Sequence, residues 1–248
     1  ISALLGMVTK YSESLLAVKY RVTDENNQMA GGPMFYIQNG MGERFIWLAK
    51  IFSVFGICTA LFGCGTFPQV NAITESVNVT FHIPIIVAGV IVTILTAVVT
   101  IGGIKSISKV AEIVVPIMAL TFLGGSVVAL VINRAVVPDA FKTIFTCAFA
   151  KESVIGGTAG TGVITFMTVM RTGIARGVYT NEAGLGSSPI VAAAAKTNSG
   201  VRQGLLSMTS VFVTTILTCS MTGLVIISSG LMNSSDMNGS TLVTAAYN

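Results

Sequence analysis

Residues 83–104, IPIIVAGVIVTILTAVVTIGGI, contain no charged side chain. A helix that crosses the hydrocarbon core of a bilayer needs about 20 predominantly apolar residues, so this window is long enough to span a membrane. Three further uncharged windows meet the same condition: Ile51–Thr74, Ile113–Asn133 and Gln203–Ser235. The four windows together predict a polytopic membrane protein.

The composition of the chain supports the same class. Hydrophobic residues make up 52% of the 248 residues and charged residues only 10%, whereas soluble domains carry about 25% charged residues. Strands of a transmembrane barrel would alternate apolar and polar residues over about ten positions. No segment alternates in this way, so we predict an all-α fold.

Two weaker windows complete the predicted set of spans. Ile1–Tyr20 is apolar apart from Lys10 and Glu13, and Ser153–Met170 is uncharged but rich in glycine. We predict a single transmembrane domain over 1–248 with spans at about 1–20, 46–74, 83–104, 111–133, 153–171 and 204–230. Because the chain does not start with methionine and is already apolar there, we expect a fragment of a longer protein, incomplete at both ends.

Basic residues near the span ends indicate the orientation, because lysine and arginine favour the cytoplasmic side. If the first span runs from outside to inside, ten basic residues fall inside: Lys19, Arg21, Arg44, Lys50, Lys105, Lys109, Arg171, Arg176, Lys196 and Arg202. Arg134, Lys142 and Lys151 fall outside, and Lys10 lies within a span. We therefore predict a multi-pass protein of the plasma or inner membrane.

The motifs of soluble enzymes and nucleic-acid binders are missing. The four cysteines have no C-x-x-C spacing, so a metal knuckle is not expected. The single histidine, His82, lies in a short loop, and neither H-E-x-x-H nor G-x-S-x-G occurs. The net charge of +4 is explained by short basic loops rather than by a nucleic-acid surface. We predict neither an enzyme nor a nucleic-acid partner.

The fifth predicted span opens with GGTAGTG at 156–162. Each glycine weakens a helix by up to about 1 kcal/mol relative to alanine, so this span is a candidate broken helix. In transporters such breaks free backbone groups that hold a carboxylate or a cation at mid-membrane, and Thr158, Thr161 and Thr165 would add hydroxyls. The alternative is that Gly156 and Gly160 form a packing face for a neighbouring helix.

The second span contains two amides, Gln69 and Asn71, directly after Pro68. In lipid such groups must find partners or face a cavity. A polar ligand is one partner, and hydrogen bonding to another helix is the other.

Two groups of charged residues could serve either function or structure. Lys10 and Glu13 are three positions apart, which favours a mutually neutralising structural pair over a proton relay. On the predicted cytoplasmic side, TNEAGLGSSP (180–189) follows Arg171 and Arg176, which we expect within reach of Glu182. Such ion pairs suit either a cytoplasmic gate or an ordinary loop staple.

Shorter elements are predicted between the spans. Ser188 before Pro189 predicts the N-cap and first-turn proline of a short helix. The break at Gly31-Gly32-Pro33 precedes an apolar patch that favours a short interfacial helix. An amphipathic stripe on the outer membrane face, or packed onto neighbouring helices, is predicted from Phe141, Ile144, Phe145 and Phe149.

Three segments resemble one known family: ARGVYTNEAGLGSSPIVAAAA (175–195), LLGMVTKYSESLLAVKYR (4–21) and GGPMFYIQNGMG (31–42). In this order they resemble the alanine or glycine:cation symporter family, the sodium:alanine symporters, over essentially the whole chain. The resemblance implies a leucine-transporter-like fold built from inverted repeats. The predicted spans would then be core helices two to seven, with the glycine-rich span at unwound helix six.

The resemblance also implies a substrate site. It implies that Gln69 on core helix three faces the substrate, with Asn71 alongside. The broken helix would supply the other substrate-binding residues: Gly160, Thr161, Gly162, Thr165 and Phe166. The gate or loop staple would comprise Arg171, Arg176, Asn181 and Glu182. CGTFPQVNAI (64–73) departs from the family's usual GNMVQANSI at Pro68, which bears on substrate identity.

The function implied by the resemblance is sodium-coupled symport of a small neutral amino acid, alanine or glycine, by alternating access. Sodium (Na+) is the expected coupling ion, and its principal site is expected largely outside this chain, in core helices one and eight. Proton coupling is the first alternative and a channel the second. The expected partners are the amino acid, sodium and the lipid bilayer, and the sequence is silent on the oligomeric state.

Overall fold

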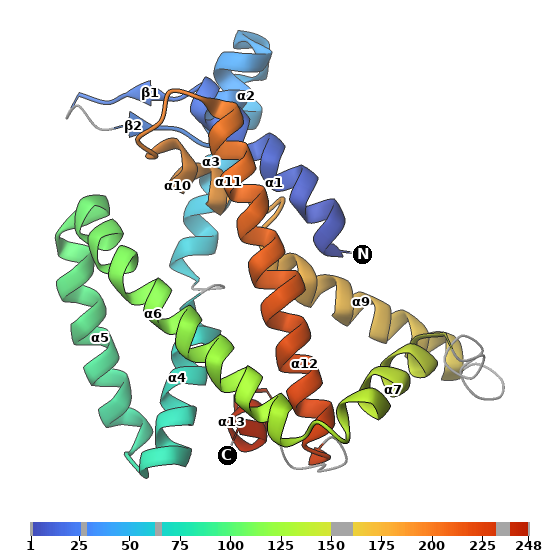
Figure 1. The fold of residues 1–248 in the computed structure, drawn as a ribbon. Coiled ribbons are helices and arrows are strands. Elements are labelled where there is room, and N and C mark those ends of the chain that lie inside the picture. Colours follow the sequence, from blue (N-terminus) through green and yellow to red (C-terminus); the bar gives the residue numbers. More distant parts are fainter. Residues whose placement is uncertain (1, 26–28, 63–65, 150–160, 232–238, 248) are drawn as a thin grey trace. The chain divides into compact units, whose positions relative to one another are not determined.

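The computed structural model describes residues 2–25, 29–62, 66–149, 161–231 and 239–247 (Figure 1). They divide into two compact units. The first unit comprises Ile1–Leu61 and Thr146–Ser220, and the second comprises Phe62–Phe145 and Met221–Asn248.

Helices dominate the described residues, and several are long and apolar enough to cross a membrane. The candidates are Ser106–Ile132 and Gly200–Ser228, together with the segment 43–81, of which 63–65 lie outside the described residues; Ile85–Ile101 is a shorter apolar helix. Their apolar side chains are largely exposed, such as Ile86 (81%) and Ile101 (86%), as expected of surfaces that face lipid. Within the described residues the chain is an all-α membrane protein apart from one very short strand pair.

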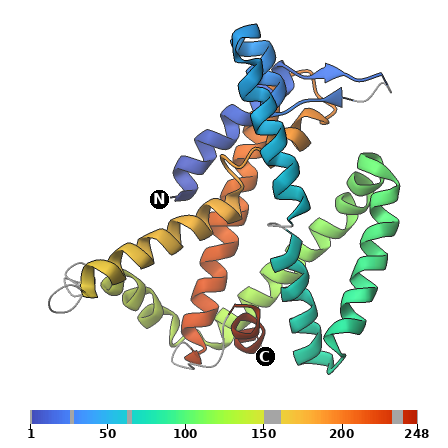
Figure 2. The same ribbon diagram turned by 180° about the vertical axis from the view of Figure 1, so that it is seen from behind.

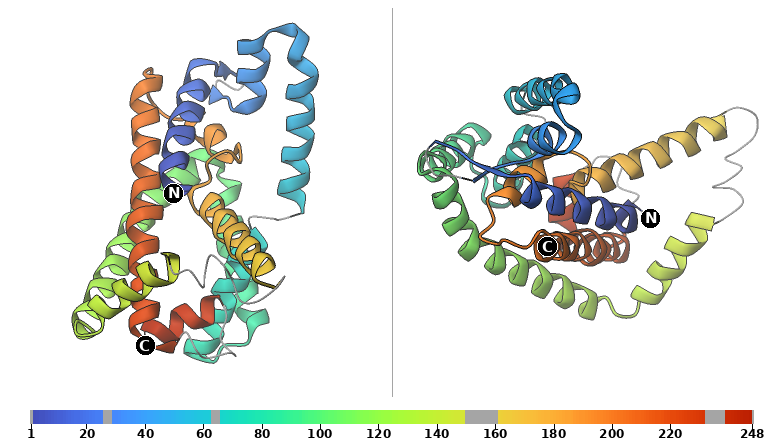
Figure 3. Two further views of the ribbon diagram at one scale, coloured as in Figure 1. Left: turned by 90° about the vertical axis from the view of Figure 1, so that its right-hand side faces the viewer. Right: turned by 90° about the horizontal axis from the view of Figure 1, so that it is seen from above.

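The first unit is organised around α1 (Ser2–Lys19), which lies beside α11 (Gly200–Val211) (Figure 3). The two backbones approach closely at Gly204, where an added Cβ would lie 3.0 Å from the carbonyl oxygen of Tyr11. Ser14 Oγ donates a hydrogen bond to Ser207 Oγ at 2.8 Å. Small residues and a buried polar contact join membrane helices in this way when apolar surface offers no preference for protein over lipid.

After α1 the chain forms a hairpin and a short helix. Strands β1 (Val22–Thr23) and β2 (Met29–Ala30) pair antiparallel, with Val22 opposite Ala30. Helix α2 (Pro33–Met41) begins with proline at its first position, where the missing N–H costs nothing. The short helix predicted after Gly31-Gly32-Pro33 is therefore present. A 3₁₀ turn (Glu43–Phe45) leads into α3 (Ile46–Leu61).

The other helices of the first unit are α9, α10 and the start of a long composite helix. Helix α9 (Thr161–Asn181) extends ten residues beyond the predicted span end at 171, and 153–160 lie outside the described residues. Helix α10 is Ser187–Ala193. The span predicted at 204–230 is α11, then a π-helical stretch (Phe212–Thr218), then α12 (Cys219–Ser228).

The second unit contains α4 (Thr66–Phe81), α5 (Ile85–Ile101) and α6 (Gly103–Ile132), and α4 lies beside α5 (Figure 2). Helix α7 (Val137–Phe149) includes the predicted amphipathic stripe, in which Phe141 and Phe145 are exposed. Helix α13 (Ser240–Tyr247) contacts both α4 and α6. It does so through hydrogen bonds of 2.7 Å from Ser240 Oγ to Glu75 Oε2 and between Tyr247 and buried Ser126.

Candidate functional site

The turn between α9 and α10 requires unusual backbone geometry. Glu182 has φ of 51°, Gly184 of 84° and Gly186 of 79°. Glycine adopts such angles without steric cost, and other residues rarely do. Gly186 is the N-cap of α10, so the prediction of Ser188 as N-cap was wrong. A left-handed glycine ends the turn, and the helix begins one residue before Ser188.

Lys10 of α1 hydrogen-bonds a carbonyl group at the C-terminal end of α9. Its Nζ donates a hydrogen bond of 3.1 Å to the carbonyl oxygen of Asn181. Nζ also lies 3.9 Å from Glu182 Oε2. The last carbonyl groups of a helix have no partner inside it and carry partial negative charge. The lysine therefore closes the C-terminal end of α9 from another helix.

A second point of attachment lies one turn along α1. Glu13 Oε2 accepts a hydrogen bond of 3.3 Å from the backbone N–H of Gly184. Lys10 thus donates to a carbonyl group of this turn, and Glu13 accepts from one of its backbone N–H groups. Among the described residues no salt bridge joins Lys10 to Glu13, but their opposite charges stabilise each other electrostatically, in accord with the predicted structural pair. Their hydrogen bonds go to the turn, and we call this arrangement the α1 clamp: Lys10 and Glu13 on the Asn181–Gly184 turn.

Asn181 provides a third attachment and is 3% exposed. Its Nδ2 donates to the carbonyl oxygen of Ser2 at 3.3 Å, and its Oδ1 accepts from the N–H of Ala183 at 3.1 Å. The space beside it depends on Gly6, because a Cβ there would lie 2.5 Å from Asn181 Nδ2. The start of α1 is therefore fitted to the end of α9.

Arg21, just beyond α1, hydrogen-bonds carbonyl groups at the C-terminal end of α10. Its guanidinium donates to the carbonyl oxygens of Ala193 (3.1 Å), Ala195 (2.8 Å) and Thr197 (2.7 Å). These groups lie at and after the C-terminal end of α10. The planar fork of arginine suits several acceptors at once. Two glycines also lie close to neighbouring segments: Gly31 approaches Ala193, and Gly186 lies against Phe52 and Pro33. These contacts bring together the segments 4–21, 31–42 and 175–195.

The predicted gate residues are only partly brought together. Asn181 and Glu182 belong to the α1 clamp, whereas Arg171 and Arg176 are exposed on α9. Within the described residues the ion pair of Glu182 is with Lys10, so the expectation that two arginines pair with it was wrong. The reason is that α9 stays helical to Asn181, which carries Arg176 more than one turn away along the helix.

The predicted substrate residues fall in both units. Gln69 and Asn71 are exposed on α4 in the second unit, and the carbonyl oxygen of Asn71 accepts from Thr74 Oγ1 at 3.1 Å. In the first unit, α9 begins at Thr161 and includes Gly162, Thr165 and Phe166. Gly160 lies outside the described residues.

Sequence reasoning missed the partners of Lys10 and Arg21. A signal existed for Lys10, because an ionisable group inside a span marks a specific partner by default. For Arg21 the sequence holds no comparable signal. Across the described ranges, no three His, Cys, Asp or Glu side chains gather as a metal site.

A model of the sodium:alanine symporter family matches residues 1–248. The chain belongs to the sodium:alanine symporter family. It is 49% identical to an uncharacterized transporter of Haemophilus influenzae over 99% of this chain and 53% of that protein. It is 40% identical to the sodium/alanine symporter AgcS of Methanococcus maripaludis over 100% of this chain and 54% of that protein.

A third relative is YrbD, a putative sodium/proton-dependent alanine carrier protein of Bacillus subtilis. The two are 33% identical over 97% of this chain and 48% of the relative. The symporter-family chain thus spans about half the length of the curated relatives it matches. The three segments that carried the resemblance are the segments that the α1 clamp, Arg21 and the nearby glycines hold together.

Proposed function

We propose that this chain is part of a secondary transporter that couples sodium entry to the uptake of a small neutral amino acid, alanine or glycine. The observation that carries the proposal is the family match over all of 1–248. The apolar helices are in accord with it. We propose a leucine-transporter-like fold in the plasma or inner membrane, working by alternating access, and a transport protein rather than an enzyme.

We propose that Gln69 and Asn71 contribute one wall of the substrate site. Each amide offers both a donor and an acceptor, which suits the amino and carboxylate groups of an amino acid. The segment Gly160–Phe166 stays a prediction from the family resemblance, and its glycine and threonine side chains are small. Alanine and glycine are therefore preferred over leucine.

We propose that the α1 clamp is the cytoplasmic gate of this transporter. Each of its contacts joins a side chain of α1 to the end of α9, so a movement of α9 away from α1 would break them together. Charge-assisted hydrogen bonds are stronger than neutral ones, and among the described residues two of them join α1 to the turn, beside the neutral bond from Asn181 to Ser2. That number suits a latch that opens in every transport cycle.

Proton coupling is kept as the second candidate, because the name of the Bacillus subtilis relative includes both ions. The test is uptake of labelled alanine by the complete protein in proteoliposomes, with and without an inward sodium gradient. We expect uptake to require sodium. Sodium-independent uptake driven by a proton gradient would move the proposal to the second candidate, and no amino-acid flux under either gradient would end it.

The proposed substrate wall is tested in the same assay with Gln69→Ala. We expect the KM for alanine to rise about tenfold, since one lost hydrogen bond to a charged group is worth about 1.5–3 kcal/mol. Gln38→Ala is the matched control, because Gln38 is an exposed amide on α2. An unchanged KM in Gln69→Ala would move the substrate site away from this residue.

A further inference from the structure

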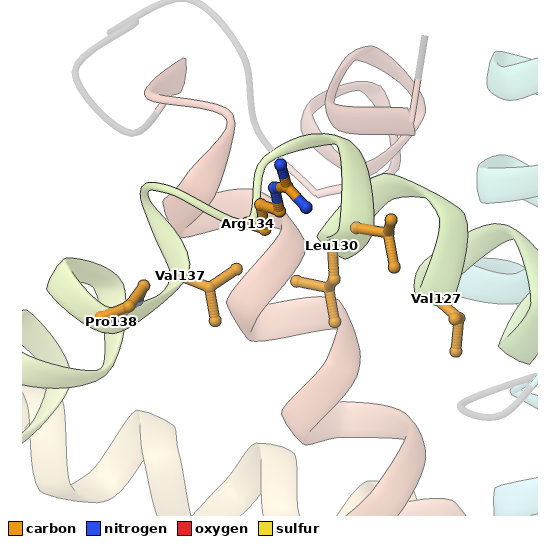
Figure 4. Close-up of a pocket in the computed structure, with 6 residues that line it drawn as sticks. Val127, Leu130, Arg134, Val137 and Pro138 are labelled. Atoms are coloured by element: carbon orange, nitrogen blue, oxygen red, sulfur yellow. The ribbon is translucent and has the colours of Figure 1, made fainter.

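The corner between α6 and α7 forms an open apolar groove in the second unit (Figure 4). The groove encloses about 290 Å³ and is lined by Val127, Leu130, Val131, Arg134, Val137 and Pro138. It falls at the lower end of the roughly 300–1,000 Å³ of small-molecule pockets. Almost all of the lining is aliphatic, and the only polar side chain in it is Arg134.

Several hydrogen bonds hold the corner between α6 and α7. Val136 N–H donates to the carbonyl oxygen of Asn133 at 2.9 Å, and Asn133 Nδ2 donates to that of Ala129 at 3.1 Å. Ala140, on the first turns of α7, is 2% exposed. Both walls of the groove therefore belong to one continuous, well-packed corner.

Arg134 differs from the other groups in the groove. It is exposed, and its guanidinium has no hydrogen-bond or ion-pair partner among the described residues. Figure 4 shows it at the corner between Leu130 and Val137, with the guanidinium directed away from the aliphatic side chains. Asp139 lies close in sequence but does not line the groove. The groove thus has an apolar floor and an unpaired cation at its rim.

The position of the corner along the membrane normal follows from α6. The candidate span Ser106–Ile132 ends two residues before Arg134, so with α6 across a bilayer the guanidinium would lie at the level of the lipid headgroups. The groove begins below it, where Val127 (50% exposed) and Val131 (61% exposed) face outward at the level of the acyl chains. Phospholipids have the same order, with a phosphate above an acyl chain.

We propose that this groove binds one anionic phospholipid, with its phosphate on Arg134 and the upper part of one acyl chain against Val127, Leu130, Val131, Val137 and Pro138. Charge complementarity identifies the occupant. A purely apolar helix covering the groove would bury the guanidinium without a partner, which costs more than leaving it in water. An anionic headgroup supplies the missing acceptor and keeps the cation at the interface.

The test is native mass spectrometry of the complete protein in detergent, titrated with phosphatidylglycerol or with phosphatidylcholine. We expect preferential retention of phosphatidylglycerol. In Arg134→Ala its apparent affinity should fall about tenfold, because one charge-assisted contact is lost. Arg44→Ala is the matched control, since Arg44 is an exposed arginine outside the groove.

A second variant tests the apolar half of the groove. Val131→Trp keeps Arg134 but fills the space beneath it, and the site is exposed enough to accept the larger side chain. We expect it to weaken phosphatidylglycerol binding as much as Arg134→Ala does. Retention lost in Arg134→Ala but kept in Val131→Trp would overturn the groove as the binding site. Equal retention in Arg134→Ala and Arg44→Ala would overturn the proposal, as would a groove covered by another part of the longer protein.

Discussion

Lys10 Nζ donates a 3.1 Å hydrogen bond to the carbonyl oxygen of Asn181, 171 positions later in the chain. Both residues are buried, at 8% and 3% exposed. The contact joins the first helix of the first unit to the end of α9. Together with the hydrogen bond between Glu13 and Gly184, it joins α1 to the turn that follows α9.

Removing the lysine charge should destabilise the protein. Lys10→Met keeps the length of the side chain but leaves the Asn181 carbonyl and the Glu182 carboxylate without their donor. We expect a loss of about 1–3 kcal/mol of unfolding free energy, measured by thermal unfolding in detergent. Lys19→Met is the matched control, because Lys19 is exposed at the end of α1. Equal losses in both variants would show that the Asn181 contact is energetically unimportant.

Neutralising Glu182, the acid that pairs with Lys10, should lower the unfolding free energy less. The Glu182 side chain is 55% exposed and lies 3.9 Å from Lys10 Nζ. Solvent-exposed ion pairs contribute about 0–1 kcal/mol. We therefore expect Glu182→Gln to lose less stability than Lys10→Met, measured in the same unfolding assay. A larger loss in Glu182→Gln would mean that the ion pair, rather than the hydrogen bond to Asn181, holds the turn.

Gly186 should tolerate no side chain. Its φ is 79°, and an added Cβ would overlap the ring of Phe52. Gly186→Ala should cost at least the 1–3 kcal/mol or so of a left-handed non-glycine residue. Gly184→Ala, with φ of 84° but open space around it, should cost less. In Gly173→Ala, within helix α9 and also in open space, stability should not fall; equal losses in all three would contradict the geometry.

The alkaline limit of stability should depend on Tyr36 of α2. Burial, with a smaller contribution from the Glu13 carboxylate, raises the pKa of Tyr36 from 10.0 to about 12. Between these pH values the unfolded chain has lost the phenolic proton and the folded chain has kept it. The unfolding free energy therefore falls as pH rises through this range, and below it Tyr36 has no effect on the pH dependence.

The measurement compares wild type with Tyr36→Phe from pH 9 to 12 or so, the range set by the two pKa values. Phenolate absorbance of the folded proteins should show one tyrosine fewer ionising at the upper end in the variant. The alkaline decline of stability should also be shallower in the variant. If the titration missing from the variant were centred near pH 10 rather than near 12, and the two declines of stability were identical, Tyr36 would ionise normally.

Several expectations depended on local pattern and were confirmed. The helix at Pro33–Met41 follows from a glycine break, a first-turn proline and an apolar patch. The amphipathic helix at Val137–Phe149 follows from four apolar residues at helical spacing. The N-cap of α10 was misplaced, because Ser188 and Pro189 are a common start signal. A left-handed glycine ended the turn earlier.

The amino-acid sequence by itself determined the membrane class and the family. Length and apolar composition suffice for the membrane class, because the thickness of the hydrocarbon core and backbone hydrogen bonding are the same for every spanning helix. Only the tertiary structure decided which polar groups meet. Lys10 and Glu13 hydrogen-bond the turn at Asn181–Gly184 instead of each other, because the close approach of α1 to the end of α9 offers a carbonyl and an N–H that no neighbour in sequence can satisfy.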